Sequence, residues 1–520
     1  MRALVLLLLA LAPFAARAEP ASLGRNLNAR LVASVFESAF TFMEPRTLEK
    51  LPIPTLAVWA LGGLTALDGR LAPDVQDGRL RLTLSGRVLA ARLVPAADDA
   101  AGWGAAMAAL AQAGWDASDA VRQGGTQGVM RALFDELCGH LDPYSRYVPP
   151  DEADADREHR AGVAWIGAQA VARRGGFTLR DVVPDGPAAA AGVRDGDRLL
   201  AVDGQKLDGL RLDAVTALLA GPEGTQVLLT LRGWREPERS VVVERRLLPP
   251  HTVAAAWHAD VLVLQVSGFA LDTGSQLAEA LAEALTAPRR PHGVVIDLRG
   301  NRGGLLRQAV VAAETLIGDG VVAVTAGRDP DAAHDFIAHG VDLAAGLPVV
   351  VLVDAGSASS AEILAAALAD QHRAVVVGSS TLGKGLVQTI APLPDGGELF
   401  VSWSRVFAPL GWPLQGLGVL PQVCTSEGAP PLAQQLARLD QGVQPLALAL
   451  ARHRAARPPL TPNEVLEIRN ACPAAEGSAL DMSAARRLLH DPAAYAAALL
   501  GPPPARVATV LHAGDAGATP

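Results

Sequence analysis

The sequence predicts a multidomain protein with an α/β core, a compact β-rich unit ahead of that core, and helical regions at both ends. A chain of 520 residues is too long for one ordinary domain, and its length suggests about three to four. Residues 258–423 alternate strand-like and helix-like runs, as parallel strands joined by helical crossovers do. Residues 162–248 instead hold short strands between glycine turns. We therefore divide the chain into residues 1–18, 19–158, 159–248, 249–423 and 424–520.

Residues 1–18 have the pattern of an export signal. Arg2 precedes an apolar run at 3–12, and Ala16-Arg17-Ala18 has the small-x-small form of a signal peptidase site. A run of about ten apolar residues is too short to span a bilayer, although a retained anchor is the alternative. We expect cleavage before Glu19, no stable membrane span, and a periplasmic or secreted protein.

The charge and the cysteine content exclude several classes of function. A formal net charge of −9 gives no reason to expect nucleic acid as a partner. We predict no metal or cofactor, because no Cys and His cluster has ligand spacing and no glycine-rich phosphate loop is present. Cys138, Cys424 and Cys472 are too few for a disulfide framework. One bridge, Cys424–Cys472, would tie the last region to the preceding domain.

The two terminal regions have helical patterns. Residues 31–42 and 127–141 have helical periodicity, and residues 79–93 alternate polar and apolar side chains as a hairpin does. The acidic stretch 151–158 is typical of a solvated linker. The residues after Cys424 are rich in Ala, Leu and Pro and predict helices separated by proline breaks.

Residues 162–248 contain an ordered series of glycine turns that resembles a PDZ domain. The series begins with Asp-Gly-Pro-Ala at 185–188 and Ala-Gly-Val at 191–193, and a Gly-Pro-Glu-Gly turn at 221–224 follows a short helix. PDZ domains bind an extended peptide as an added strand and hold its terminal carboxylate on the N–H groups of a loop. The resemblance places that loop at Trp165, Ile166, Gly167 and Ala168, with Trp165 where the usual loop begins with glycine. The alternative is a PDZ fold that serves only as a spacer.

A glycine-rich turn follows the strand-like run that begins at Val294. The sequence Arg-Gly-Asn-Arg-Gly-Gly at 299–304 leads into an apolar helix at 305–316. Such a turn leaves N–H groups free to face an anion at the positive end of a helix. A tight strand–helix connection that needs glycine would have the same sequence.

Ser359 is predicted to lie where a helix begins after the strand at 348–354. Serine is a preferred helix N-cap, and a lone serine at this place is most often only a cap. Here small residues surround Ser359, and the N–H of Ser360 lies beside its hydroxyl, where it could meet an oxyanion. No Gly-x-Ser-x-Gly sequence of the lipase type surrounds it.

Lys384 is one of only three lysines, with Lys50 and Lys206, in a chain that otherwise uses arginine. Arginine cannot lose its proton in a protein, whereas a desolvated lysine can act as a base. Because glycines flank Lys384 within an apolar stretch, it is a candidate base, and a surface lysine on a mobile loop is the alternative.

Together these motifs resemble the carboxy-terminal processing proteases, a family of PDZ-containing serine peptidases. The resemblance extends from Leu-Asp-Pro-Tyr-Ser-Arg-Tyr at 141–147 to Gln-Gly-Leu-Gly-Val-Leu-Pro at 415–421. It implies a crotonase-like α/β core and cleavage of proteins near apolar C-termini, and it leaves the oligomeric state open, a homo-oligomer included. The implied site residues are Ser359 as nucleophile, Lys384 as base, Gln388 as the residue that orients the lysine, and Gly303 or Gly304 with Ser360 as oxyanion donors.

Two other functions fit parts of the sequence. A Ser-His-Asp protease would need a histidine such as His372, but that residue follows the predicted helix exit and we expect it to be structural. A catalytically inactive periplasmic PDZ scaffold would require the loss of Ser359, Lys384 or Gln388, and all three are present.

Overall fold

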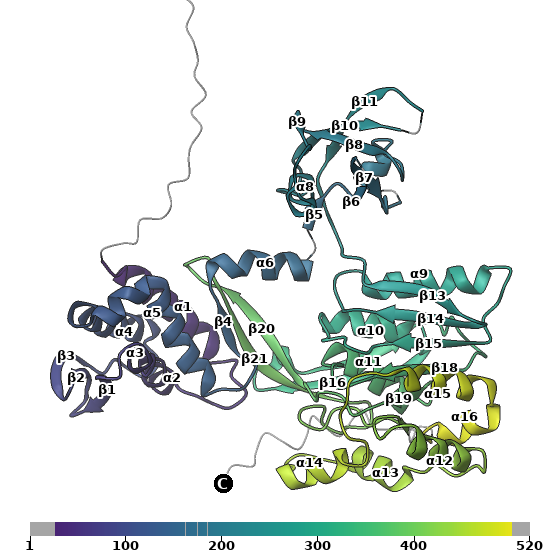
Figure 1. Cartoon of the computed structure of the whole chain (residues 1–520). Coiled ribbons are helices and arrows are strands. Elements are labelled where there is room, and N and C mark those ends of the chain that lie inside the picture. The colour runs from purple at the N-terminus through teal and green to yellow at the C-terminus, as the bar shows by residue number, and fades with distance from the viewer. Residues whose placement is uncertain (1–25, 162, 174, 185, 234, 502–520) are drawn as a thin grey trace, which may run out of the picture. The chain divides into compact units, whose positions relative to one another are not determined.

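The computed structural model describes residues 26–161, 163–173, 175–184, 186–233 and 235–501 (Figure 1). The predicted export signal lies outside these residues. The chain forms two compact units, which we describe separately. The first comprises the chain up to Glu44, Leu51–Pro149 and Ala391–Leu399, and the second comprises Pro45–Lys50, Pro150–Ile390 and the chain from Phe400 onward. None of the described helices combines the length and hydropathy that crossing a bilayer requires.

The first unit packs helices against a small antiparallel sheet. Its helices are α1 (Ala29–Met43), α2 (Ile53–Leu61), α3 (Gly63–Leu67), α4 (Ala100–Ala117) and α5 (Asp119–Gly139). Its strands are β1 (Leu71–Gln76), β2 (Arg79–Leu84), β3 (Arg87–Leu93) and β4 (Arg146–Val148). The antiparallel pair β2–β3 confirms the predicted hairpin at 79–93, and α1 and α5 confirm the two predicted helices.

Aromatic stacking forms part of the core of the first unit. The ring of Phe134 stacks on Phe36 and on Tyr147, each with ring centroids 4.6 Å apart. The Tyr147 hydroxyl donates to Asp395 Oδ2 at 2.5 Å. Since Asp395 lies in the segment 391–399, the tip of a hairpin that begins in the second unit belongs to the first unit.

The acidic stretch at 151–158 is helical, so the predicted linker lies within α6 (Pro150–Ala161). Asp151 and Glu152 occupy the first turn of α6. Negative side chains there are stabilised by the positive end of the helix dipole, which explains how so polar a sequence forms a helix.

The β-rich unit has its own hydrophobic core. Its strands are β5 (Val163–Trp165), β6 (Gln169–Arg173), β7 (Gly176–Arg180), β8 (Arg198–Val202), β9 (Gln205–Lys206), β10 (Gln226–Arg232), β11 (Glu238–Glu244) and β12 (Arg246–Leu248), and its helices are α7 (Pro187–Ala190) and α8 (Leu212–Leu219). The main sheet has the order β11-β10-β8-β7-β6, and β5 pairs with β12. Strand β6 therefore lies at the edge of the sheet. Ile166, Leu179, Val215 and Val227 are among the side chains buried between the sheet and α8.

A largely parallel sheet forms the centre of the second unit. Its order is β13 (Val253–His258), β14 (Val261–Val266), β15 (Gly293–Asp297), β18 (Val349–Val353), β19 (Val375–Gly378) and β22 (Val423–Cys424). Strands β14 to β22 run parallel, and β13 pairs antiparallel with β14. Near-continuous valine and leucine in β15, β18 and β19 suit strands that are buried on both faces.

Helices cover both faces of this sheet. One face packs against α9 (Thr273–Thr286), α10 (Leu306–Glu314) and α11 (Ser360–Asp370). The alternate residues of the same strands pack against α12 (Ala429–Leu439), α15 (Ala479–His490) and α16 (Pro492–Ala498). Figure 1 shows α15 beside β18 and β19. Three helices of the region predicted as a separate tail, α12, α15 and α16, therefore form one layer of the core.

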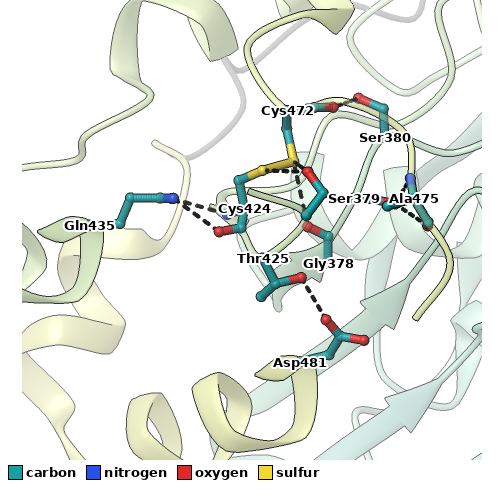
Figure 2. Close-up of a disulfide and its surroundings, with 10 residues drawn as sticks. Gly378, Ser379, Ser380, Cys424, Thr425, Gln435, Cys472, Ala475 and Asp481 are labelled. Carbon is teal, nitrogen blue, oxygen red and sulfur yellow. Dashed lines mark hydrogen bonds between the residues drawn. A yellow bond between two sulfur atoms is a disulfide. The ribbon is translucent and has the colours of Figure 1, made fainter. Parts of the chain in front are cut away.

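A second, antiparallel sheet completes the second unit. Its order is β17 (His334–His339), β16 (Asp319–Gly327), β21 (Glu398–Phe407) and β20 (Leu386–Pro392), and a short 3-10 helix (Pro330–Ala332) joins β16 to β17. Two further helices, α13 (Ala447–Ala455) and α14 (Pro462–Arg469), follow α12. Cys424 and Cys472 form a disulfide, the bridge that the sequence allowed (Figure 2). Cys138 is buried as a free thiol.

His453 in α13 predicts a loss of stability in acid. Its Nε2 bonds to the Gly418 carbonyl at 2.8 Å, and its ring packs on Trp412. Burial, together with the nearby charges of Arg469 and Arg454, lowers the pKa of His453 to about 4, although the hydrogen bond with Gly418 opposes the shift. Below about pH 6.5, His453 takes up a proton in the unfolded chain more readily than in the folded protein. The stability that His453 contributes therefore falls as the pH drops from 6.5 towards 4.

We expect acidification from about pH 7.5 to about pH 5 to cost roughly 2 kcal/mol of unfolding free energy through this histidine. Urea unfolding of wild type and His453→Gln at both pH values measures the effect, because the difference between the two proteins removes the contribution of other titrating groups. The exposed His251, changed to Gln, is the matched control. An equal acid loss in wild type and His453→Gln would contradict this prediction.

Candidate active site

Three turns meet at the carboxyl-terminal edge of the parallel sheet. The glycine turn (299–304) follows β15, the serine turn (354–359) follows β18, and the lysine loop (379–385) follows β19. Because β15, β18 and β19 are neighbouring parallel strands, their carboxyl ends lie side by side. The sheet order thus brings together motifs that are far apart in the sequence.

Ser359 has a strained backbone at the point where the serine turn enters α11. Its φ is 55° and its ψ is −117°, outside the regions that non-glycine residues normally occupy. Such a conformation costs on the order of 1–3 kcal/mol and is found mainly where function requires it. The sharp strand-to-helix turn holds the side chain partly exposed, as nucleophile turns do, although the usual Gly-x-Ser-x-Gly sequence is absent.

The last two glycines of the glycine turn, Gly303 and Gly304, lie against Ser359 and Ser360. A Cβ on Gly303 would come within 2.7 Å of Ser359 Cβ and 3.0 Å of the Ser360 nitrogen. A Cβ on Gly304 would meet the Phe269 carbonyl oxygen at 2.1 Å. Ser360 Oγ also donates to the Gly304 carbonyl at 3.0 Å. The structure therefore brings the predicted nucleophile and the predicted oxyanion donors together, and only glycine allows the close approach.

The N–H groups of the two glycines differ in their partners. Gly303 N–H donates to Asn301 Oδ1 at 2.8 Å, and the buried Asn301 in turn donates to the Val266 carbonyl at 2.7 Å. The N–H groups of Gly304 and Ser360 have no acceptor in the part of the chain that the structure describes. Of the two glycines that the sequence proposed as donors, Gly304 is the one whose N–H is available here.

Glu362 joins the serine turn to the lysine loop. Its Oε2 accepts from the backbone N–H of Ser359 at 2.7 Å and from that of Lys384 at 2.9 Å. Its Oε1 accepts from Gly383 N–H at 2.7 Å and from the Thr381 hydroxyl. The carboxyl is fully buried, and burial raises its pKa while the bonds from Thr381, Gly383, Ser359 and Lys384 oppose that shift.

This role of Glu362 was not predicted from the sequence. The signal was present, because a glutamate three residues after a serine N-cap can reach back to the cap's own N–H. What the sequence could not show is that the same carboxylate also receives two N–H groups from the lysine loop, more than twenty positions away.

Lys384 is partly buried, and a neighbouring segment explains the glycines beside it. A Cβ on Gly385 would meet the Gln415 nitrogen at 2.1 Å, and one on Gly383 would meet the Gly416 backbone at 3.0 Å. Gly385 N–H also donates to Gln415 Oε1 at 2.9 Å. The loop that carries Lys384 is therefore packed against the segment 414–418.

Gln388 lies in β20, the strand that begins just after Lys384. Its Nε2 donates to the Leu386 carbonyl and to Ser402 Oγ, both at 3.0 Å. These bonds fix the side-chain amide. Its oxygen is the atom that could accept a hydrogen bond from a lysine amine.

His372 lies at the end of α11 opposite Ser359. The eleven residues of α11 separate the two by about 16 Å along the helix. The ring of His372 is exposed and contacts the Leu500 carbonyl. His372 is therefore structural, as predicted, and too far from Ser359 to take its proton.

The predicted carboxylate loop lies between β5 and the edge strand β6. Ile166 and Ala168 are buried, and Gly167 has a φ of 76°, which suits glycine. The carbonyls of Ile166 and Gly167 accept from Ala188 N–H and Val183 N–H, each at 2.8 Å. Trp165 is partly buried and forms an isolated antiparallel β-bridge with Ala220, which follows the last residue of α8. The edge strand and α8 therefore flank this loop.

Comparisons with known proteins match the part of the chain that carries the three catalytic turns and most of the β-rich unit, and the predicted carboxylate loop precedes the second match. The profile of peptidase family S41 matches residues 260–425, and a PDZ domain profile matches residues 178–233. A carboxy-terminal-processing protease from Bartonella bacilliformis is 31% identical over 294 residues, which cover 56% of this chain and 68% of that protein. A probable CtpA-like serine protease from Staphylococcus aureus is 31% identical over 313 residues, or 59% of this chain and 62% of that protein.

A solved photosystem II D1 C-terminal processing protease shares 29% sequence identity with this chain. The match covers 56% of this chain and 81% of that one, with a TM-score of 0.34. Sequence identity above 30% over two thirds of the Bartonella protein, together with the two domain profiles, shows the family. The chain therefore belongs to peptidase family S41, in the group of carboxy-terminal-processing proteases, and is a serine-type peptidase.

Proposed function

We propose that this protein is an exported endopeptidase that cleaves proteins near their C-termini with a Ser359–Lys384 dyad. Two features of Ser359 carry the proposal. Its backbone is strained, and its N–H and the N–H of Lys384 both donate to the same buried carboxylate, that of Glu362. A strained backbone at a non-glycine residue is typical of functional sites, and the shared carboxylate fixes the spacing between the serine turn and the lysine loop. A crotonase-like core is part of the proposal, supported by the parallel sheet and its antiparallel companion.

The chemical step is acyl transfer. Neutral Lys384 takes the proton of the Ser359 hydroxyl as Oγ attacks a peptide carbonyl carbon. The N–H groups of Gly304 and Ser360 stabilise the negative charge that develops on the carbonyl oxygen. Lys384 then gives its proton to the departing amine. Water, deprotonated by the same lysine, attacks the acyl carbon, and Lys384 returns this proton to Ser359 Oγ as the C–O bond to the serine breaks. Gln388 orients the lysine amine.

Substrate capture is assigned to the PDZ domain. Strand β6 is an edge strand with α8 beside it, the arrangement that accepts an added peptide strand. Trp165, Ile166, Gly167 and Ala168 would receive the terminal carboxylate at the end of that strand. Substrates with apolar C-termini fit this arrangement, because the side chains around the loop are themselves apolar.

The function is tested with purified protein and an unstructured protein substrate that has a free, apolar C-terminus. Mass spectrometry of the products should show cuts that begin near the C-terminus of the substrate. Binding without cleavage would instead support the inactive PDZ scaffold. The mass of the protein recovered from a bacterial periplasm tests export, with a chain that starts near Glu19 as the expected result.

A C-terminal amide on the substrate is expected to reduce capture. We compare one peptide as free acid and as amide, and expect a several-fold higher KM for the amide with little change in kcat, because the amide lacks the charge that the loop N–H groups bind. Equal kcat and KM for both peptides would show that the terminal charge is not recognised. Trp165→Gly would then restore the residue with which the usual loop begins.

A further inference from the structure

The segment 472–478, here called the tail strap, contacts the three catalytic turns, and Figure 2 shows its contacts with the lysine loop. It has no helix or strand of its own. Its first contacts are with the lysine loop: Ser380 Oγ donates to the Cys472 carbonyl at 2.6 Å. Ser379 Oγ donates to the Ala475 carbonyl at 2.8 Å and accepts from Ala475 N–H at 3.1 Å.

The tail strap also holds the serine turn. Ala355 N–H donates to the same Ala475 carbonyl at 2.9 Å. Gly477 N–H donates to Asp354 Oδ2 at 3.2 Å. Ala475 therefore joins the serine turn to the lysine loop, in addition to the link that Glu362 makes.

Asp354 extends these contacts to the glycine turn. Its other oxygen, Oδ1, accepts from Gly356 N–H at 2.9 Å and from Gly300 N–H at 2.8 Å. Arg299, at the start of the glycine turn, donates to the Ser478 carbonyl at 3.0 Å. The strap and Asp354 together contact every turn that carries a proposed catalytic group.

The disulfide fixes one end of the tail strap to the sheet. Cys424 ends β22, and its backbone N–H and carbonyl are both bound by the Gln435 side chain, at 3.0 and 2.9 Å. Cys424 and Cys472 are buried. Just beyond the other end of the strap, Asp481 in α15 accepts from Ser478 N–H at 2.6 Å and from Thr425 Oγ1 at 2.5 Å, so both ends are held beside β22 (Figure 2).

We propose that the tail strap positions the serine turn and the lysine loop for catalysis, with Ser379 and Asp354 as positioning residues and the Cys424–Cys472 disulfide as its anchor. The strained backbone of Ser359 keeps its conformation only when enough surrounding contacts hold it in place. The strap supplies such contacts from outside the parallel sheet. The inference rests on the proposed function for the roles of Ser359 and Lys384.

The test compares Ser379→Ala and the double variant Cys424→Ala/Cys472→Ala with wild type in peptide cleavage. We expect kcat to fall about tenfold in each, with KM within about twofold, because loss of a positioning contact displaces the reacting groups without touching the substrate site. Ser426→Ala is the matched control. Its hydroxyl lies 3.2 Å from Cys424 Sγ and contacts the disulfide rather than a catalytic turn, so its kcat should stay at the wild-type value.

Hydrogen exchange provides a second measurement that needs no activity. In the Ser359→Ala background, Ser379→Ala should lower protection of the amides of Ala355 and Ala475 while the central strands keep theirs. If the cysteine variant does not fold, Ser379→Ala decides the question alone. Unchanged kcat with unchanged exchange in Ser379→Ala would overturn the role of the strap. Cleavage by Ser359→Ala would overturn the proposed function. The exchange result would still show whether the tail strap holds the serine turn and the lysine loop.

Discussion

Replacing Ser359 with alanine is expected to lower peptide cleavage by about a thousandfold or more while leaving the protein folded. The alanine variant has no hydroxyl to attack the peptide carbonyl, and removal of a nucleophile of this kind costs at least that much. The change removes one partly exposed hydroxyl at a helix N-cap, which costs about 1 kcal/mol and is too little to unfold the core. Initial rates on an unstructured protein substrate, with far-UV circular dichroism as the check on folding, measure both effects.

The variant Ser359→Gly separates the effect of backbone strain on stability from the effect of losing the nucleophile on activity. Glycine adopts a φ of 55° without steric cost, so this variant should be as inactive as Ser359→Ala yet more stable than it by about 1 kcal/mol. Urea unfolding compares the two variants. Retained cleavage in either variant would show that the nucleophile is a different residue.

Replacing Lys384 with arginine is expected to be as damaging as replacing it with alanine. Arginine keeps the positive charge and most of the length, so an ion-pairing or carboxylate-binding role would survive the change. A general base must spend part of its time unprotonated, and arginine does not lose its proton in a protein. We therefore expect both variants to lose about a thousandfold in kcat or more.

Lys206→Arg is the matched control, because Lys206 is an exposed lysine in β9 and should tolerate arginine with full activity. Peptide cleavage by wild type, Lys384→Arg, Lys384→Ala and Lys206→Arg decides the question. Substantial activity in Lys384→Arg would mean that another group accepts the Ser359 proton. His372 is not that group, since α11 separates it from the serine.

Features with a local physical cause could be predicted from the sequence. The hairpin at 79–93 follows from alternation, and the PDZ turns follow from glycines at fixed spacing. The placement of Ser359 before α11 follows from a strand, a run of small residues and a helix in that order. The alternation of strands and helices between 258 and 423 was enough to predict a parallel sheet, because such connections need crossovers.

Features that depend on contacts between distant segments could not be predicted. The sequence after Cys424 has the apolar periodicity of helices, but nothing in it shows that α12, α15 and α16 cover a sheet built from residues 261–423. Glu362 has the pattern of a cap residue, and its second set of partners lies in another loop. The bond from Gly303 N–H to Asn301 likewise depends on how the glycine turn folds, which glycine content alone does not determine.

Covalent trapping tests most directly whether Ser359 is a nucleophile that Lys384 activates. A peptidyl phosphonate reacts with an activated serine hydroxyl to leave a stable phosphonyl ester, which tryptic mapping by mass spectrometry locates. We predict a single phosphonyl group on Ser359 in the wild-type protein, none in Ser359→Ala, and a rate of labelling in Lys384→Arg that is lower by at least about a hundredfold. Labelling of another residue, or labelling of Ser359 in Lys384→Arg at the wild-type rate, would contradict the claim.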